Sequence, residues 1–180
     1  TKRFCECLKG EKLELPALMA LHSMRMSELL GVKWKFVNLD KRYIEISGSR
    51  VLDENDVLIY KETNKSDRSR RVIPIMSDQL LNALKAAQQD DGEAFVIQTA
   101  PHVISRWLKK FCEENGFPNL SMHSLRHTFA SLGAYLNLNP DTIQEIGGWK
   151  DVQTMKKIYT HTYQTDIKNS SNVLSRFLNQ

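Results

Sequence analysis

His123 and Arg126 are the residues whose types and spacing best suit chemistry, and they lie in the run His-Ser-Leu-Arg-His at positions 123–127. They are three residues apart, so in a helix both project from one face. Apolar residues recur at helical spacing from Leu125 to Leu136, which predicts such a helix. An imidazole beside a guanidinium can bind a phosphate and move a proton next to it. A helix with an ordinary polar edge is the alternative that this pair alone leaves open.

Arg25 is a second arginine of interest, because its neighbours Leu21, Met24 and Leu29 are apolar and a charged side chain there needs a partner. A metal site is not predicted. His123 and His127 are four residues apart, as in a zinc-binding helix. However, the residue after His123 is serine rather than the glutamate of metalloproteases, and no third ligand is evident.

A basic segment lies between two strand-like runs, at 57–60 and 72–75. Its basic residues are Lys61, Lys65, Arg68, Arg70 and Arg71, against the acidic Glu62 and Asp67. The pattern predicts a β-hairpin with a basic tip that could contact a polyanion, and a solvated loop is the alternative. The formal net charge of +4 and the pI near 8.9 permit a nucleic-acid partner without requiring one.

The elements that must position these residues are mostly helical. With 180 residues, 41% hydrophobic and 26% charged, the chain is expected to form one soluble globular domain. Caps and apolar spacing predict helices over 16–21, 27–30, 78–89, 101–115, 121–136, 140–147 and 151–159. A strand over 43–46 joins the hairpin strands, so we expect an α+β fold with a three-stranded antiparallel sheet. The tail, 166–180, is expected to be an amphipathic helix that presents Val173, Leu174, Phe177 and Leu178.

Other function classes receive little support from the sequence. No apolar run approaches membrane-spanning length, and the first residues do not form a signal peptide. Three cysteines, Cys5, Cys7 and Cys112, cannot all pair, and Cys5 and Cys7 lack a second pair to complete a zinc set. Reduced thiols in a cytoplasmic protein are therefore expected.

Four segments, read in order, resemble the catalytic domain of the tyrosine recombinases, the phage integrase family. They are 24–34, 65–74, 123–131 and 146–152, the last followed by Tyr-Thr-His at 159–161. The resemblance runs from about Lys12 to His161. The chain departs from the family pattern at two places: His22-Ser23-Met24 stands where Thr-Gly-Leu is common, and Trp149 stands where many members have histidine.

The resemblance implies a site-specific recombinase that cleaves and rejoins DNA through a 3′-phosphotyrosine intermediate, to integrate or excise a phage or mobile element. It needs neither ATP, a metal nor another cofactor, because the covalent intermediate keeps the bond energy. The implied catalytic residues are Arg25, Lys65, His123, Arg126, Trp149 and the nucleophile Tyr159. The two arginines would neutralise the phosphate, Lys65 would protonate the leaving oxygen, and His123 would exchange a proton with Tyr159. Glu28 would orient Arg25 or His123, and Trp149 would donate its indole N–H or pack.

Some of these assignments leave alternatives. Lys61 competes with Lys65, and Tyr163 competes with Tyr159, whereas Tyr43, Tyr60 and Tyr135 are expected to pack. The residues expected to bind DNA are Arg68, Arg70, Arg71 and Lys150, with Arg106, Lys109 and Lys110 as further candidates for phosphate contacts. A topoisomerase IB-like enzyme that relaxes DNA or resolves its ends, or a catalytically silent DNA-binding regulator, are the alternative functions.

The resemblance also implies partners. These are double-stranded DNA, a homotetramer on paired recombination sites, and accessory directionality or DNA-bending proteins, in the cytoplasm of a bacterial host. The tail would dock on a neighbouring protomer, or fold back on its own domain. Members of the family usually carry a site-binding domain before the catalytic domain. Too few residues precede Arg25 for one, so a fragment of a longer integrase is expected.

Overall fold

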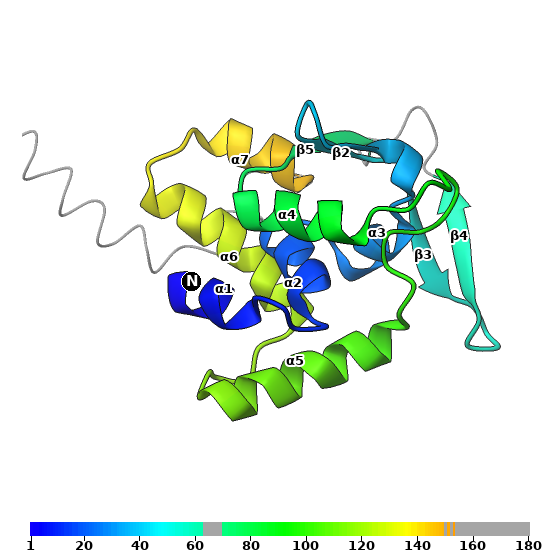
Figure 1. Cartoon of the computed structure of the whole chain (residues 1–180). Helices are drawn as coiled ribbons and strands as arrows, with labels where there is room; N and C mark the ends of the chain where they lie inside the picture. Colours follow the sequence, from blue (N-terminus) through cyan, green and yellow to red (C-terminus); the bar gives the residue numbers. More distant parts are fainter. Residues whose placement is uncertain (63–69, 150, 152, 154–180) are drawn as a thin grey trace, which may run out of the picture.

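The structure is a computed structural model that describes residues 1–62, 70–149, 151 and 153 (Figure 1). The helices of this part are α1 (Lys2–Leu8), α2 (Glu14–Leu21), α3 (Met26–Gly31), the short 3-10 helix η1 (Trp34–Phe36), α4 (Asp78–Ala87), α5 (Pro101–Asn115), α6 (Met122–Tyr135) and α7 (Pro140–Gly147). The strands are β1 (Val37–Asn38), β2 (Tyr43–Ile46), β3 (Gly48–Leu52), β4 (Leu58–Glu62) and β5 (Arg71–Pro74).

Helix α2 lies at the centre of the helical body, where it packs against α3, α4 and α6 (Figure 1). Its residues from Pro16 to Ala20 are all buried. A helix that is apolar on every side is stable only inside a protein, so α2 supplies much of the core. The turn that follows α2 leads directly into Arg25, and this core helix therefore sets the position of the first arginine.

Local signals at the helix ends explain why several helices lie where the sequence predicted them. The Ser77 side chain accepts a hydrogen bond from the Leu80 backbone N–H and begins α4. Pro101 is the first residue of α5, and Gly116 ends that helix at φ 65°. The Ser121 side chain caps α6 by accepting from the Ser124 N–H. The predicted 151–159 and tail helices lie outside the described residues, apart from residues 151 and 153.

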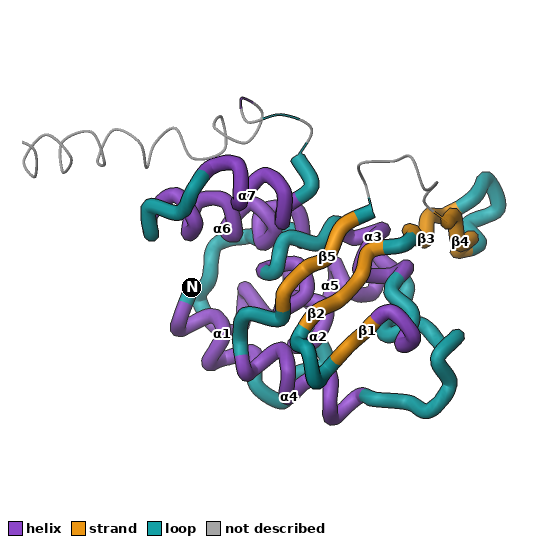
Figure 2. The backbone as a smooth tube through the Cα atoms, turned by 90° about the horizontal axis from the view of Figure 1, so that it is seen from above, coloured by secondary structure: helices purple, strands orange, loops and turns teal. Residues whose placement is uncertain are grey.

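The predicted mostly helical α+β fold with a three-stranded antiparallel sheet is confirmed, but the strands of that sheet differ from the prediction. They lie in the order β1-β2-β5, and a separate hairpin pairs β3 with β4 (Figure 2). The hairpin predicted between 57–60 and 72–75 is therefore wrong, because the two runs belong to different sheets. The cause is the turn after β3, where one carboxylate oxygen of Asp53 accepts from the N–H groups of Asn55 and Val57. This turn sends β4 back along β3 and leaves β5 to pair with β2.

A second, smaller core lies between α6 and α7 and consists of Phe129, Ala130, Ile143 and Trp149. The rings of Phe129 and Trp149 stack with centroids 6.4 Å apart. This core fixes the chain just after α7 against the helix that carries His123 and Arg126.

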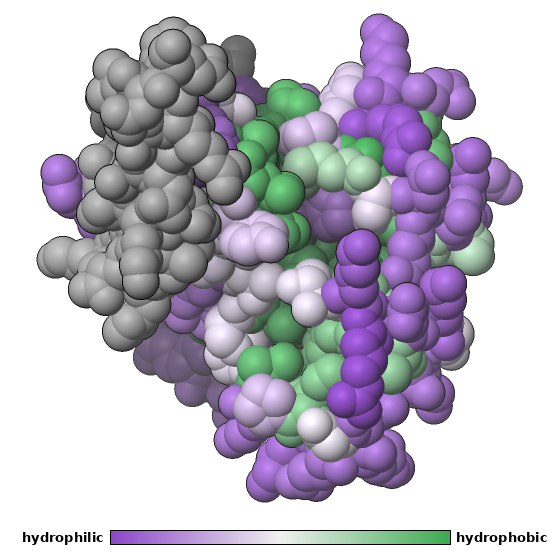
Figure 3. Space-filling view, turned by 90° about the vertical axis from the view of Figure 1, so that its left-hand side faces the viewer, coloured by the Kyte–Doolittle hydropathy of each residue, from purple (hydrophilic) through white to green (hydrophobic). Residues whose placement is uncertain are grey.

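Apolar side chains gather in a band on the side of the molecule where α6 ends and α7 begins (Figure 3). Four large side chains at the end of α6 and just after it are exposed: Leu132, Tyr135, Leu136 and Leu138. Tyr135 is 68% exposed, so the packing role predicted for it is wrong. A largely apolar cavity of about 380 Å³ lies between the end of α6 and residues of α1, α2 and the start of α4. Within the described part of the chain, no helix is both long and apolar enough to span a bilayer.

Candidate active site

Arg25 is the residue that precedes the first turn of α3, and Glu28 in that turn reaches back to it. The Arg25 backbone N–H donates to Glu28 Oε2 at 2.7 Å, and its guanidinium donates to Glu28 Oε1 at 2.5 Å. The carboxylate therefore satisfies an otherwise unpaired N–H at the start of the helix and orients the arginine. The Arg25 side chain remains 42% exposed, so it can also reach a ligand.

Arg126 approaches the same carboxylate from α6 and is almost fully buried, with 2% of its side chain exposed. Its guanidinium donates to the Ser23 carbonyl and, at 2.6 Å, to the Gly147 carbonyl. It lies 3.7 Å from Glu28 Oε2 and 4.6 Å from the centroid of the Trp149 ring. Arg126 thus connects the turn before α3 with the end of α7.

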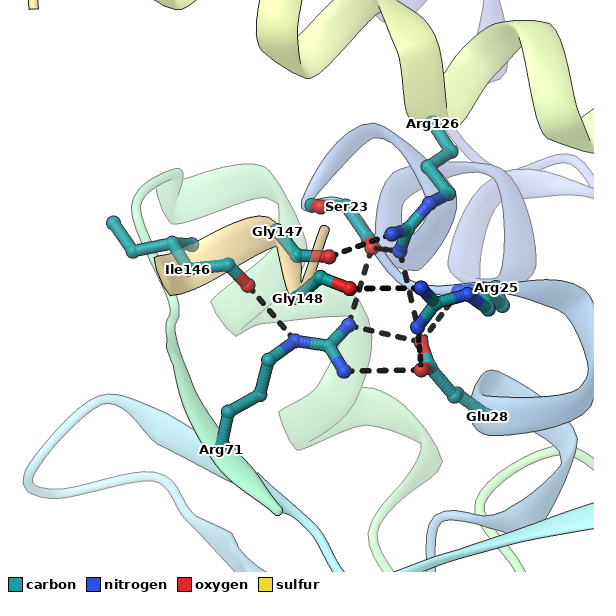
Figure 4. Close-up of polar contacts among 8 residues, drawn as sticks. All are labelled: Ser23, Arg25, Glu28, Arg71, Arg126, Ile146, Gly147 and Gly148. Atoms are coloured by element: carbon teal, nitrogen blue, oxygen red, sulfur yellow. Dashed lines mark hydrogen bonds and ion pairs between the residues drawn. The ribbon is translucent and has the colours of Figure 1, made fainter. Parts of the chain in front are cut away.

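A third arginine, Arg71 on β5, completes the cluster (Figure 4). Its two terminal nitrogens donate to the two Glu28 oxygens at 3.0 and 2.9 Å, and its Nε donates to the Ile146 carbonyl at 2.9 Å. Only 5% of the side chain is exposed. The sequence-based expectation that Arg71 binds DNA therefore needs correction, because its guanidinium faces the interior and contacts protein groups.

Three consecutive carbonyl groups at the end of α7 each accept a hydrogen bond from one of these arginines (Figure 4). Ile146 accepts from Arg71, Gly147 from Arg126, and Gly148 from Arg25 at 2.8 Å. The last carbonyls of a helix have no partner within the helix and carry the negative end of its dipole. Guanidinium groups from three distant parts of the chain are favourable partners for them.

The cluster has more positive than negative charge, since three guanidiniums surround the single carboxylate of Glu28. Burial by itself raises the pKa of Glu28, but the hydrogen bonds and charge of Arg71, followed by the charge and backbone N–H of Arg25, lower it to about 2. Burial is the main cause that lowers the pKa of Arg126 to about 9, and the charge of Arg25 adds to it. A bound anion would balance the excess positive charge and favour the charged form of Arg126, so the site is suited to a phosphate.

Arg25, His123 and Arg126, predicted from distant segments, line one cavity of about 450 Å³. The remaining walls are mainly apolar and include Leu30 and Met122. His123 is exposed, and its ring packs edge-on against His127 with centroids 4.1 Å apart. Burial, followed by the charges of His123 and Arg126, lowers the pKa of His127. Arg50 lines the cavity as well, so the cavity offers three guanidiniums and an accessible imidazole to one ligand.

The structure places other predicted residues away from this cavity or does not describe them. Trp149 is buried and lies beneath Arg126. Lys61 is exposed in β4, opposite Ser49. Arg70 lies at the protein surface, 3.6 Å from a Glu45 carboxylate oxygen. The predicted residues Lys65, Arg68, Lys150, Tyr159 and Tyr163 lie outside the described residues.

Sequence reasoning missed the interior role of Arg71, although the chain contains a signal for it. Side chains alternate between the two faces of a strand, so Arg71 shares its face with Ile73, which is fully buried. Val72 between them is 53% exposed. The alternation indicates an inward-facing arginine, which needs a buried acidic partner such as Glu28.

Comparison with known proteins agrees with this geometry. The family model described as the phage integrase family matches residues 4–166. The chain is 25% identical over 203 residues to a tyrosine recombinase XerC-like protein of Caldanaerobacter subterraneus subsp. tengcongensis, which covers 97% of this chain and 52% of that protein. It is 30% identical over 163 residues to the integrase of Staphylococcus phage L54a, which covers 80% of this chain and 46% of the integrase. The chain thus spans about half the length of these relatives.

Solved structures show the same fold. A crystal structure of XerA recombinase superposes with a TM-score of 0.72 at 20% identity, covering 94% of this chain and 60% of that one. A structure of the Tn1549 transposon integrase in complex with a circular intermediate DNA gives a TM-score of 0.71 at 20% identity. The match covers 93% of this chain and 63% of the integrase chain.

Proposed function

The chain belongs to the phage integrase family, and on that premise we propose that it is the catalytic domain of a site-specific tyrosine recombinase. It cleaves and rejoins DNA through a covalent 3′-phosphotyrosine intermediate, in the integration or excision of a phage or other mobile element. The observation that carries this proposal is the meeting of Arg25, Arg126 and His123 at one cavity. The three come from two distant segments, and together they match the needs of phosphoryl transfer.

In the proposed reaction the Tyr159 hydroxyl oxygen attacks the phosphorus atom, forming a new P–O bond while the bond to the 5′-oxygen breaks. The leaving oxygen takes a proton from Lys65, and His123 accepts the proton of Tyr159. Attack by a DNA 5′-hydroxyl on the phosphotyrosine reverses these transfers and rejoins the strand.

Arg25 and Arg126 act on the charge of this reaction. The transition state concentrates negative charge on the non-bridging oxygens, and a guanidinium can bind two of them in a fixed geometry. Arg126 is held in place by the Ser23 and Gly147 carbonyls. Arg25 is half-exposed at the same cavity, so it can turn toward the phosphate without a rearrangement of the core.

Double-stranded DNA is the proposed substrate. In support, the similar Tn1549 integrase structure contains DNA. Arg70 lies at the surface beside the arginine cluster, and it is proposed, together with Arg68 and Lys150, to contact DNA phosphates.

Recombination between two duplexes calls for a homotetramer on paired sites. We propose that the tail, 166–180, contributes to it by docking on a neighbouring protomer. The apolar cavity of about 380 Å³ and the exposed Leu132, Leu136 and Leu138 around it support this, because such a face favours an apolar partner. Accessory directionality or DNA-bending proteins are further proposed partners.

The test is a duplex that is nicked close to the scissile phosphate, so that a cleaved fragment diffuses away and the covalent adduct accumulates. Wild-type protein should form a protease-sensitive adduct that denaturing gels resolve. Tyr159→Phe should abolish the adduct with little effect on DNA binding, because only a hydroxyl is lost, whereas Tyr163→Phe should form it normally. The adduct should also form in EDTA.

The outcomes of this experiment separate the alternatives. An adduct formed by Tyr159→Phe but not by Tyr163→Phe would assign the nucleophile to Tyr163. DNA binding without any adduct would indicate a regulator. An adduct without strand exchange between two duplexes would indicate a topoisomerase-like enzyme, and loss of cleavage in EDTA would contradict the metal-free mechanism.

A further inference from the structure

We propose that Arg71 is a positioning residue of this active site, which acts on the phosphate-binding Arg25 through Glu28. The inference rests on the proposed function, and it assigns a role to an arginine outside the set that the family resemblance supplied. Arg71 is not expected to touch DNA. It is expected to hold the Glu28 carboxylate and the end of α7 in the arrangement that the two phosphate-binding arginines require.

The contacts of Arg71 with Glu28 are the first step of the argument. Both terminal nitrogens of the guanidinium donate to the two carboxylate oxygens, at 3.0 and 2.9 Å. The side chains are 5% and 7% exposed, respectively, so water contributes little to either group. A planar, paired contact of this kind fixes the orientation of a carboxylate more strongly than a single hydrogen bond does.

The second step concerns Arg25, which shares Glu28 Oε1 with Arg71. Because Arg71 already balances the charge of the carboxylate, Glu28 holds Arg25 less strongly than an unbalanced carboxylate would. Without Arg71, the carboxylate would draw Arg25 into its own ion pair and away from the phosphate. Arg71 therefore sets how readily Arg25 can turn into the cavity.

The third step is the contact of Arg71 with the end of α7. Its Nε donates to the Ile146 carbonyl at 2.9 Å. The next two carbonyls, of Gly147 and Gly148, accept from Arg126 and Arg25. A shift of this segment would therefore change the positions of both phosphate-binding arginines. Displacements of about 1 Å in an active site can lower rates by roughly 100-fold.

Arg3 provides a control, since it has the same side chain, is exposed, and donates to the Asn115 carbonyl outside the arginine cluster. The experiment measures two quantities for each variant: the dissociation constant for DNA, and the single-turnover cleavage rate of the nicked duplex at saturating protein. Arg71→Ala should lower the cleavage rate roughly 10- to 100-fold with a dissociation constant close to that of wild type. Arg3→Ala should cleave at the wild-type rate.

A double-mutant cycle tests whether Arg71 acts through Glu28. Glu28→Gln removes the carboxylate that Arg71 balances. The double variant, Arg71→Ala with Glu28→Gln, should therefore slow cleavage by a smaller factor than the product of the factors measured for the two single variants. If Arg71→Ala cannot be purified in folded form, Arg71→Lys replaces it, because it keeps the charge but loses the paired contact. The same loss of rate at unchanged affinity is expected.

Two results would overturn the inference. One is a weaker and less salt-dependent affinity of the Arg71 variant for DNA at an unchanged cleavage rate, as a direct phosphate contact predicts. The other is a double variant that slows cleavage by the full product of the factors of the two single variants. If wild-type protein forms no adduct, the proposed function fails first. If wild type forms the adduct and the Arg71 variant behaves like Arg3→Ala, only this inference fails.

Discussion

Arg25 and Arg126 bind the same carboxylate, but only Arg126 belongs to the interior: their side chains are 42% and 2% exposed. Arg25→Ala is expected to remove about 3–4 kcal/mol of transition-state stabilisation and to leave the free energy of unfolding almost unchanged. Arg126→Ala should lose a similar amount of transition-state stabilisation. It should also lower the free energy of unfolding by roughly 3 kcal/mol, since the Gly147 carbonyl loses its donor and the Ser23 carbonyl keeps only a 3.4 Å contact with Arg71.

Single-turnover cleavage and urea unfolding, measured on both variants, check this prediction. Equal destabilisation by the two substitutions would show that exposure does not separate their roles. Full cleavage activity of either variant would remove that arginine from the proposed phosphate site.

Ser23 is the second residue with a specific prediction, because its backbone has φ 76°, a left-handed conformation that favours glycine. Its hydroxyl is buried without a hydrogen-bond partner. Ser23→Gly should therefore raise the free energy of unfolding by about 1 kcal/mol and the melting temperature by roughly 2–4 °C. Unfolding in urea and by heat measures the two changes, and a destabilised variant would contradict the strain argument.

The sequence indicated the position of Ser23 but not its conformation. The resemblance to the tyrosine recombinases predicts glycine at this position, and the presence of serine alone does not say which backbone conformation the turn adopts. The structure shows that Ser23 adopts a left-handed φ of 76° and that its carbonyl accepts from Arg126. That contact joins residues 103 positions apart, so no local pattern predicts it.

At the scale of elements, the helix boundaries were predictable because their causes are local. Ser77, Pro101, Gly116 and Ser121 each act within one helical turn of their own position. The strand pairings depend instead on competition between distant partners. The run at 57–60 could have paired with 72–75, but the short turn after Asp53 favours β3. The alternation that turns Arg71 inward was visible, yet its partner Glu28 belongs to another element.

The end of α7 gives the prediction at this scale. Gly148 has φ 62°, and a Cβ there would lie 2.9 Å from the Cζ of Arg71. Gly148→Ala should lower the free energy of unfolding by more than the roughly 1 kcal/mol that backbone strain alone costs. It should also slow cleavage, because the contact displaces Arg71.

Gly116 is the matched control for this substitution, since it ends α5 at φ 65° and a Cβ at this position would have no atom of another residue within 4 Å. Gly116→Ala should cost about 1 kcal/mol and leave the cleavage rate unchanged. Urea unfolding and single-turnover cleavage measure both variants. Similar effects of the two substitutions would show that the contact with Arg71 adds nothing.

At the scale of the whole molecule, one carboxylate joins parts of the chain that are far apart in sequence. Glu28 on α3 contacts Arg71 on β5 and lies close to Arg126 on α6. Both arginines also donate to the end of α7. The charge state of Glu28 should therefore affect the stability of the entire fold rather than of one helix.

The pH dependence of unfolding tests this role. The pKa of Glu28 is lowered from an ordinary 4.5 to about 2 in the folded state. A lowered pKa means that the stabilisation is fully present above about pH 4.5 and is lost as the pH falls toward 2. Glu28→Gln should cost on the order of 2–3 kcal/mol at pH 7, and the difference from wild type should shrink as the pH falls toward 3, because a protonated glutamate resembles glutamine.

Two features of the chain keep this experiment interpretable. Burial lowers the pKa of His22, so this residue also reduces the free energy of unfolding when the pH falls below 6.5, its ordinary pKa. The effect is the same in both proteins and cancels in the difference. Glu93 has a similarly low pKa, from its hydrogen bonds with Lys35 and Lys33, but its side chain is 62% exposed. In 0.5 M salt its ion pairs are screened, so Glu93→Gln should differ little from wild type at any pH. A Glu28→Gln difference that stays constant from pH 7 to 3 would show that the carboxylate does not connect these elements through its charge.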